Sequence, residues 1–183
     1  LPNQRFGVET TFKMLFRLTL IIIIKKKEMY KMIPRNEHPK PQFMRENWQN
    51  LNGTWAFEID NEVSGYEKGF YNEGIEFSKE ITVPFCSESE LSGINNTDFM
   101  NAVWYKKKVN IKKTDELIFL HIGAADYKTT IFVNGKKAGE HVGGYVSFYQ
   151  DITDKVVDGE NEICIYCEDP IKTKAIPKGK QSH

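Results

Sequence analysis

One stretch of the chain, residues 126–153 (DYKTTIFVNGKKAGEHVGGYVSFYQDIT), constrains the fold more than any other. Residues 127–133 are rich in β-branched and aromatic side chains, which fit a pleated, half-buried strand. Asn134-Gly135 follows, the pair that best tolerates the positive φ angles of a two-residue hairpin turn. Gly143-Gly144 then gives the backbone a second place to bend or to approach another segment closely. The stretch therefore predicts a β-hairpin, a glycine loop and a returning segment at 151–153.

Composition and charge narrow the class of protein. The 183 residues suit one domain with a sizeable hydrophobic core. Lysine plus arginine and aspartate plus glutamate both number 25, so no global charge argues for nucleic acid or for an acidic ligand. Short alternating apolar runs outnumber runs with a helical period. The sequence therefore predicts an all-β domain with no nucleic-acid partner.

Further strands are expected on both sides of the hairpin. Alternation puts Trp55, Phe57 and Ile59 on one face of the first strand, so Trp55 is expected in the core rather than on a sugar-binding surface. Residues 116–122 are nearly continuously apolar and predict a strand buried on both faces, with His121 as a hydrogen-bonded core residue. The strands expected outside the hairpin are 54–59, 75–84, 103–111, 116–122 and 161–168.

Three consecutive lysines, Lys106, Lys107 and Lys108, could suggest a site for phosphate or nucleic acid. They fall inside the expected strand 103–111, where neighbouring side chains point to opposite faces. The three lysines therefore cannot form one patch. We expect a solvated strand edge instead, on which the charges discourage pairing with another chain.

The cysteines give no sign of a metal site or of a disulfide framework. Their odd number, three, argues against a full set of disulfides and favours a reducing compartment. Cys164 and Cys167 have a spacing seen in zinc sites, but residues three apart on a strand point to opposite faces. We therefore expect no metal and no cofactor.

The first 32 residues differ in character from the rest. They hold seven basic and two acidic residues, a net charge of +5. The apolar run at 18–24 is shorter than the about 20 residues that a membrane-spanning helix needs. Lysines at 25–27 stand where a signal peptide would have a small-residue cleavage site. We expect residues 1–32 to be a disordered or spurious leader, the alternative being a degenerate export signal or membrane tether. The protein is accordingly expected in the cytoplasm, with no membrane partner.

A resemblance to a known family rests on the order and spacing of several motifs. The hairpin stretch, with Val133-Asn134-Gly135 and a later His-x-Gly-Gly-Tyr, resembles the N-terminal sugar-binding domain of family 2 glycoside hydrolases. That family includes β-galactosidases, β-glucuronidases and β-mannosidases. Further strings typical of it are Leu-Asn-Gly-x-Trp-x-Phe at 51–57, Val-Pro at 83–84, Val-Trp-Tyr at 103–105 and Pro-Lys-Gly-Lys-Gln at 177–181.

The resemblance implies a fold, a role and neighbours. The fold would be a jelly-roll, galactose-binding-domain-like β-sandwich over residues 33–171, with 172–183 beginning a linker to a downstream domain. The role would be that of the sugar-binding, barrel-supporting domain of a retaining glycosidase. Its partners would be a carbohydrate and the immunoglobulin-like and (β/α)8 barrel domains of the parent enzyme. The two glutamates of a retaining glycosidase would lie in that barrel, so the chain by itself has no catalytic residue and is expected to be an inactive fragment.

The resemblance also implies substrate-binding residues. In the family, residues just past the Val-Pro turn approach the substrate, and the corresponding positions here are Ser87, Glu88 and Ser89. His141 and Tyr145 are expected to face the pocket or the neighbouring domain. The alternatives are a solvated loop at 87–89 and packing of His141 and Tyr145 within the hairpin. Two other functions stay open, a free-standing carbohydrate-binding module and a structural assembly domain that binds no sugar.

Overall fold

The structure is a computed structural model and describes residues 33–170. The expectations for the leader at 1–32 and for the linker at 172–183 lie outside the described residues. The described chain falls into two compact units that divide after Gly53. None of the helices formed by residues 33–170 is long or apolar enough to cross a bilayer.

The first unit, residues 33–53, is extended and carries one turn of 3-10 helix, η1 (Pro41–Phe43), with proline at its first position. Asparagine side chains hold the extended chain together. The amide of Asn50 donates to the carbonyl of Arg35 at 2.9 Å, and the amide of Asn52 donates to the carbonyl of Pro34 at 3.1 Å. The prolines at 34, 39 and 41 exclude regular helix and central strand here.

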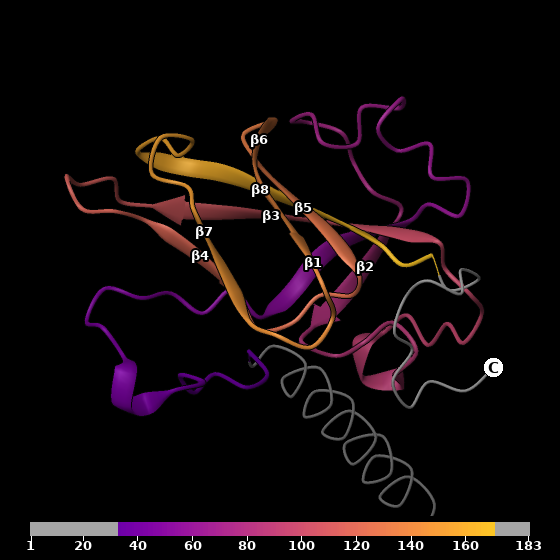
Figure 1. The fold of residues 1–183 in the computed structure, drawn as a ribbon, viewed down its shortest axis with the longest axis horizontal. Helices are drawn as coiled ribbons and strands as arrows, with labels where there is room; N and C mark the ends of the chain where they lie inside the picture. The colour runs from indigo at the N-terminus through magenta and orange to yellow at the C-terminus, as the bar shows by residue number, and fades with distance from the viewer. Residues whose placement is uncertain (1–32, 171–183) are drawn as a thin grey trace, which may run out of the picture. The chain divides into compact units, whose positions relative to one another are not determined.

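The second unit contains two β-sheets. The larger sheet has the strand order β2-β1-β3-β8-β5-β6, and β4 pairs with β7 in a two-stranded sheet (Figure 1). At the centre of the larger sheet, β3 and β8 pair antiparallel along all ten residues of each strand. The strands are β1 (Gly53–Ile59), β2 (Lys79–Val83), β3 (Ala102–Ile111), β4 (Phe119–Ile122), β5 (Lys128–Val133), β6 (Lys136–Val142), β7 (Phe148–Asp151) and β8 (Gly159–Glu168).

The hairpin predicted from the sequence is confirmed. Strands β5 and β6 pair antiparallel and are joined by Asn134 and Gly135, whose φ angles are 51° and 71°. Both angles are positive, as a tight turn that matches the twist of the strands requires. The chain bends again at Gly143, where φ is 123°. The two residues of this turn therefore place β6 beside β5, where β6 is an edge strand of the larger sheet.

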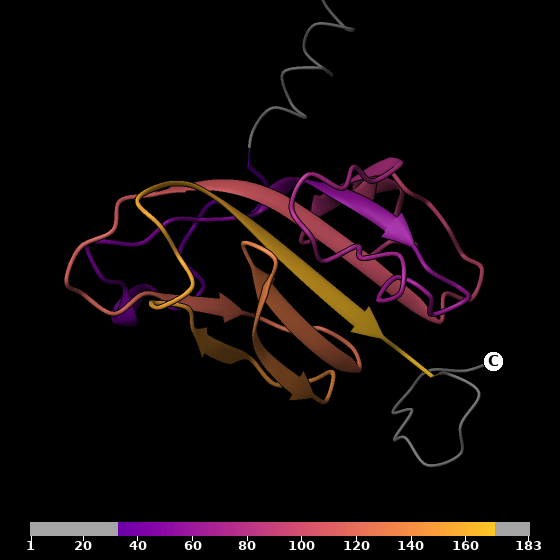
Figure 2. The ribbon, with the colours of Figure 1, turned by 90° about the horizontal axis from the view of Figure 1, so that it is seen from above.

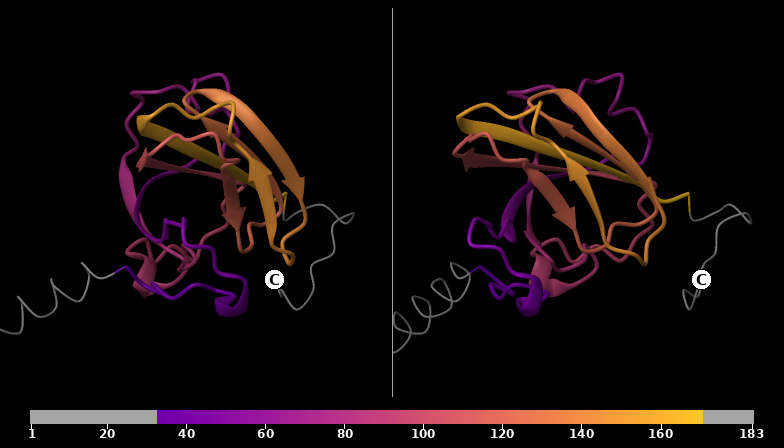
Figure 3. Two further views of the ribbon diagram at one scale, coloured as in Figure 1. Left: turned by 90° about the vertical axis from the view of Figure 1, so that its left-hand side faces the viewer. Right: turned by 60° about the vertical axis from the view of Figure 1, so that its left-hand side comes forward.

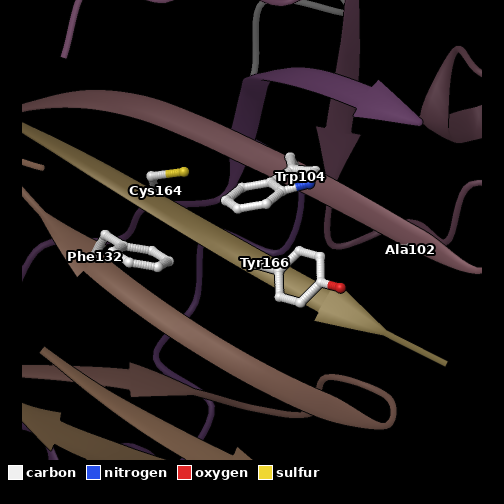
Figure 4. Packing of buried hydrophobic residues seen from close by; sticks show 5 residues of the cluster. All are labelled: Ala102, Trp104, Phe132, Cys164 and Tyr166. Atoms are coloured by element: carbon white, nitrogen blue, oxygen red, sulfur yellow. The ribbon is translucent and has the colours of Figure 1, made fainter. Parts of the chain in front are cut away.

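One face of the larger sheet carries an aromatic core. Trp104, Phe132 and Tyr166 come from β3, β5 and β8 and lie together with Ala102 and Cys164 (Figure 4). The segment between β1 and β2 covers this cluster. Its covering side chains are Tyr66, Phe70, Tyr71 and Phe77, whose rings lie about this cluster and against one another. This segment, which has no regular strand or helix, therefore supplies one apolar layer of the second unit.

The other face of the larger sheet is covered by the smaller sheet. Ile131, Val133 and Ile163 are almost completely buried on that face. Figures 2 and 3 show β4 and β7 as a second layer beside the larger sheet. Leu120 of β4 and Ile152, which follows β7, are buried. Two layers of sheet around a shared apolar interior make this unit a β-sandwich, and the predicted all-β jelly-roll class is confirmed.

Asp60, at the end of β1, holds the covering segment in place. Its Oδ2 accepts hydrogen bonds from the indole N–H of Trp104 at 3.0 Å and from the backbone N–H of Gly65 at 2.7 Å. Its Oδ1 accepts from the backbone N–H of Ser64 at 2.9 Å. Burial by itself would raise the pKa of Asp60, but these hydrogen bonds outweigh it and hold the pKa below its ordinary value.

This lowered pKa predicts a dependence of stability on pH. Because the folded-state pKa lies below the unfolded value of about 3.9, the Asp60 carboxylate stabilises the fold fully above that pH and loses this effect as the pH falls through the folded pKa. Asp60→Asn is expected to lower the free energy of unfolding by about 2 kcal/mol at pH 7. Urea unfolding at pH 7 and pH 3 checks this. A difference between variant and wild type that does not narrow at pH 3 would contradict it.

Two expectations about strands are wrong. Lys106 is not on a solvated edge, because β3 lies between β1 and β8 and the Lys106 side chain is buried. Strand β4 is not buried on both faces, because Phe119 and His121 are exposed while Leu120 is buried. The smaller sheet covers the core with one face only, so an apolar strand in it leaves its other face in solvent. The expected strand at 75–84 is shorter in the structure, where β2 begins at Lys79.

Candidate functional site

The segment that carries Ser87, Glu88 and Ser89 connects β2 to β3 and is held by its own hydrogen bonds. The carbonyl of Ser87 accepts the backbone N–H of Asn96 at 2.9 Å. The Ser87 hydroxyl is buried and donates to Glu88 Oε2 at 3.2 Å, while Glu88 itself is exposed. Ser89 caps the 3-10 turn η2 (Glu90–Ser92), because its Oγ accepts the backbone N–H of Leu91 at 3.2 Å. Of the three residues, Glu88 is therefore the one presented to solvent.

A small hollow lies beside this segment. It has a volume of about 270 Å³. Its walls combine two apolar side chains with charged and amide groups, a mixture able to hold a polar ligand by hydrogen bonds. The lining residues are Ile59 of β1, Lys79 and Glu80 of β2, and Gly93, Ile94 and Asn96 of the segment before β3. No sequence pattern marks these residues as a site, because they come from three separate parts of the chain.

His141 and Tyr145, the other two expected residues, have different environments. The His141 ring stacks on Phe148 of β7, with ring centroids 3.9 Å apart and planes 12° apart. Its Nε2 is buried and has no hydrogen-bond partner among the residues that the structure describes. Tyr145 lies in the loop between β6 and β7 and is 70% exposed. His141 therefore packs between strands, whereas Tyr145 is open to solvent.

The β6–β7 loop is anchored against the segment before β5. The backbone N–H of Gly143 donates to the carbonyl of Tyr127 at 2.8 Å. A side chain at Gly144 would lie 2.5 Å from the carboxyl group of Asp126, so only glycine fits there without displacing that group. Gly143 therefore provides the bend of the chain, and Gly144 allows the close approach to Asp126.

The structure does not bring the two groups of expected residues into direct contact. The first group, Ser87 to Ser89, follows β2. In the second group, His141 lies near the end of β6 and Tyr145 lies in the loop after it. Strands β2 and β6 form opposite edges of the larger sheet. In residues 33–170 no hydrogen bond or ring contact joins one group to the other. The expected residues therefore form two separate groups on the larger sheet rather than one site.

The cysteines show no metal-binding arrangement. Cys164 lies in the aromatic core, while Cys167 points to the opposite face, where its Sγ is 3.9 Å from Thr129 Oγ1. Burial raises the pKa of both thiols to about 12, so neither readily forms the thiolate that binds a metal. Within the described chain, no three histidine, cysteine, aspartate or glutamate residues are grouped to hold a metal ion.

Comparison with known proteins adds a family to this geometry. Residues 48–172 match the family model described as "Glycosyl hydrolases family 2, sugar binding domain". A β-glucuronidase of Paenibacillus borealis is 26% identical over 145 residues, which are 78% of this chain and 24% of that protein. A β-glucuronidase of Felis catus is 30% identical over 138 residues, 69% of this chain and 21% of that protein.

Solved structures show the same likeness. The Lactobacillus rhamnosus β-glucuronidase superposes with a TM-score of 0.60 at 27% identity, covering 66% of this chain and 21% of that one. The Ruminococcus gnavus β-glucuronidase in complex with D-glucuronic acid has a TM-score of 0.58 at 22% identity, covering 69% and 23%, and supports the fold alone. The chain spans no more than about a quarter of the length of each of these four relatives. The family model covers well over half of the chain, and the chain therefore belongs to the family 2 glycosyl hydrolases and carries their sugar-binding domain.

Proposed function

We propose that this chain serves as the N-terminal sugar-binding domain of a larger β-glucuronidase-like glycosidase. The observation that carries the proposal is the family match over residues 48–172, together with relatives that are β-glucuronidases about four times as long as the matched region. A retaining glycosidase needs two carboxyl groups about 5 Å apart, one as acid and base and one as nucleophile. In this proposal both groups belong to a barrel domain outside the chain, which the sugar-binding domain supports.

The segment at 87–89 is proposed to narrow the substrate pocket of the parent enzyme. Glu88 is exposed, and the hydrogen bond between Asn96 and Ser87 fixes the backbone beside it. A carboxylate held on a fixed backbone can accept hydrogen bonds from sugar hydroxyl groups. Ser87 would help to hold Glu88, because its hydroxyl donates to Glu88 Oε2, and Ser89 would hold the segment by accepting the backbone N–H of Leu91.

The β6–β7 loop is proposed to contact the rest of the enzyme. Val142, the last residue of β6, is 60% exposed, and Tyr145 and Val146 of the loop are 70% and 66% exposed, although all three are largely apolar. An isolated soluble domain seldom leaves neighbouring apolar side chains bare in this way. The hydrogen bond from Gly143 to Tyr127 gives the loop a fixed shape, which suits a surface that packs against another domain.

The first test asks whether catalysis lies outside the chain. The 183-residue chain is expected to show no hydrolysis of 4-methylumbelliferyl β-D-glucuronide above the buffer rate, because it lacks the barrel carboxylates. The coding sequence read past the codon for His183 is expected to continue into a barrel domain with two glutamates. The protein expressed with that continuation should hydrolyse the substrate.

Either of two outcomes would overturn the proposal. Hydrolysis by the chain alone would place the catalytic groups within it. A stop codon directly after His183, with no adjoining barrel gene, would remove the parent enzyme, and a free-standing carbohydrate-binding module would then become the leading function.

The second test concerns Glu88. Glu88→Gln in the protein with its continuation is expected to lower kcat/KM about tenfold through loss of about 1.4 kcal/mol of substrate binding. The change keeps the shape of the side chain and leaves in place the cap at Ser89 and the hydrogen bond from Asn96 to the Ser87 carbonyl. Glu62→Gln is a matched control, since Glu62 is also exposed and lies in the segment between β1 and β2. Unchanged kinetics in Glu88→Gln would show that Glu88 does not bind the substrate.

A further inference from the structure

The outward face of the smaller sheet carries an unusual group of aromatic side chains. Phe119 and His121 of β4 and Tyr149 and Asp151 of β7 point away from the core, since all four are exposed while the intervening Leu120 is buried. The strands pair so that Phe119 lies opposite Asp151 and His121 opposite Tyr149. We refer to these four residues as the β4–β7 face.

The three rings contact one another. The centroids of Tyr149 and His121 are 5.6 Å apart with planes 39° apart. Phe119 stands at 88° to Tyr149 at 5.5 Å, and its centroid is 6.4 Å from that of His121. Tyr149 nevertheless remains 64% exposed and Phe119 41% exposed. The ring of Tyr149 is therefore held by two neighbours and still open to a ligand.

We propose that the β4–β7 face binds a neutral glycan, with one pyranose ring lying on Tyr149. The C–H groups on one side of a pyranose ring form an apolar surface that packs on the electron-rich face of an aromatic ring. Phe119 would contact the edge of the same sugar. The ring nitrogens of His121 and the carboxylate of Asp151 can exchange hydrogen bonds with its hydroxyl groups. This site goes beyond the proposed function, because it needs no catalytic domain and uses none of the residues at 87–89.

The charge of the face selects a neutral ligand. Asp151 is a carboxylate, and none of the other three residues of the face is lysine or arginine. Thr153 donates from its backbone N–H at 2.9 Å and from its hydroxyl at 2.6 Å to Asp151 Oδ1, and these bonds favour the charged form. A uronic acid or sulfated sugar would bring a second negative charge close to this carboxylate and would be repelled.

The same rings could simply stabilise the two-stranded sheet, because cross-strand aromatic pairs contribute about 0.2–1 kcal/mol each. Such a structural role predicts that variants change thermal stability and leave glycan binding absent throughout. The ligand role predicts that binding changes while the fold is retained. A binding measurement on folded variants therefore separates the two.

The experiment is affinity electrophoresis of the whole 183-residue chain in native gels. The gels contain hydroxyethylcellulose as a neutral β-linked glucan, polygalacturonate as an acidic polysaccharide, or no polysaccharide. Retardation is expected in hydroxyethylcellulose alone. Tyr149→Ala is expected to weaken binding at least about fivefold, whereas Tyr149→Phe, which keeps the ring, stays within about twofold of wild type. Phe99→Ala is the matched control, because Phe99 is a 61% exposed aromatic residue on a different segment.

Each result decides the matter. If hydroxyethylcellulose does not retard the wild-type chain, or if Tyr149→Ala is retarded as strongly as wild type, the proposal fails. Equal retardation by polygalacturonate would refute the selection for neutral sugars. A far-ultraviolet circular dichroism spectrum like that of wild type shows that Tyr149→Ala is folded, and His121→Ala is a second variant expected to weaken binding. Because no hydrolysis is measured, these outcomes are independent of the tests of the proposed function.

Discussion

Lys106→Ala is expected to lower the free energy of unfolding by about 3–5 kcal/mol. The ammonium group of Lys106 is buried, lies 3.1 Å from Glu162 Oε1 and donates to the backbone carbonyls of Asn72 at 2.6 Å and Ile75 at 3.1 Å. Removing it leaves a largely buried carboxylate and two carbonyl groups without their charged donor. It also releases the aromatic segment that these carbonyls belong to. Urea unfolding of the purified chain, followed by tryptophan fluorescence, measures the loss.

Lys108→Ala is the matched control for this variant. Lys108 lies two residues further along β3 and pairs with Glu160 at 3.0 Å, but both side chains are 65% exposed. An exposed ion pair contributes about 0–1 kcal/mol, so this variant should remain close to wild type. Replacing both members of the buried pair, as in Lys106→Met with Glu162→Met, should recover part of the stability lost in Lys106→Ala, because no lone charge then remains. Equal losses in Lys106→Ala and Lys108→Ala would show that burial of the pair is unimportant.

Lys106 also illustrates which parts of the fold the sequence predicts. Alternation along a strand correctly separates Lys106 from Lys107, whose ammonium group lies 5.6 Å from the centre of the Trp55 ring. Alternation says nothing about what covers each face. The cover over Lys106 is the segment between β1 and β2, which has no regular period and contacts residues far away in the chain. Long-range packing of an irregular segment is therefore what a local pattern fails to predict.

Features set by local chemistry were predicted well. The turn at Asn134-Gly135 depends on two neighbouring residues, and Trp55 and Phe57 follow a simple alternation, so both expectations are confirmed. The apolar run in β4 was misread for a different reason. A continuous apolar run predicts a strand covered on both faces, yet the exposed rings of Phe119 and His121 belong to a sheet with one open face.

The candidate site also has one part that the sequence predicts and one part that it does not. The segment at 87–89 was found through its position after Val-Pro, which is a feature of neighbouring residues. The hollow beside it was missed, because Lys79, Glu80 and Asn96 meet only when β2 and the segment before β3 fold together. The one local signal was a pair of adjacent charges, Lys79 and Glu80, inside an expected strand. Such charges are usually a solvated face, so this signal alone does not identify a pocket.

Gly65→Ala is the second change with a large expected effect, a loss of about 3 kcal/mol in the free energy of unfolding. A methyl group at Gly65 would collide with the indole nitrogen of Trp104 and lie 2.6 Å from its Cε2 and 2.7 Å from Asp60 Oδ2. Trp104 is completely buried in the aromatic core, so it cannot move aside without disturbing its neighbours. The bonds from Trp104 and Gly65 to Asp60 would stretch together. Thermal unfolding and near-ultraviolet circular dichroism of the chain check the result.

Gly123→Ala separates this collision from the general effect of replacing a glycine. Neither Gly65 nor Gly123 has a positive φ angle, so backbone strain contributes to neither variant. A methyl group at Gly123 meets no atom within 4 Å, and the change is expected to stay within about 0.5 kcal/mol of wild type. A Gly65→Ala protein as stable as Gly123→Ala would mean that the aromatic core yields to an added methyl group. The covering segment would then be loosely packed on Trp104, and the large loss predicted for Lys106→Ala, which rests on the same segment, should shrink as well.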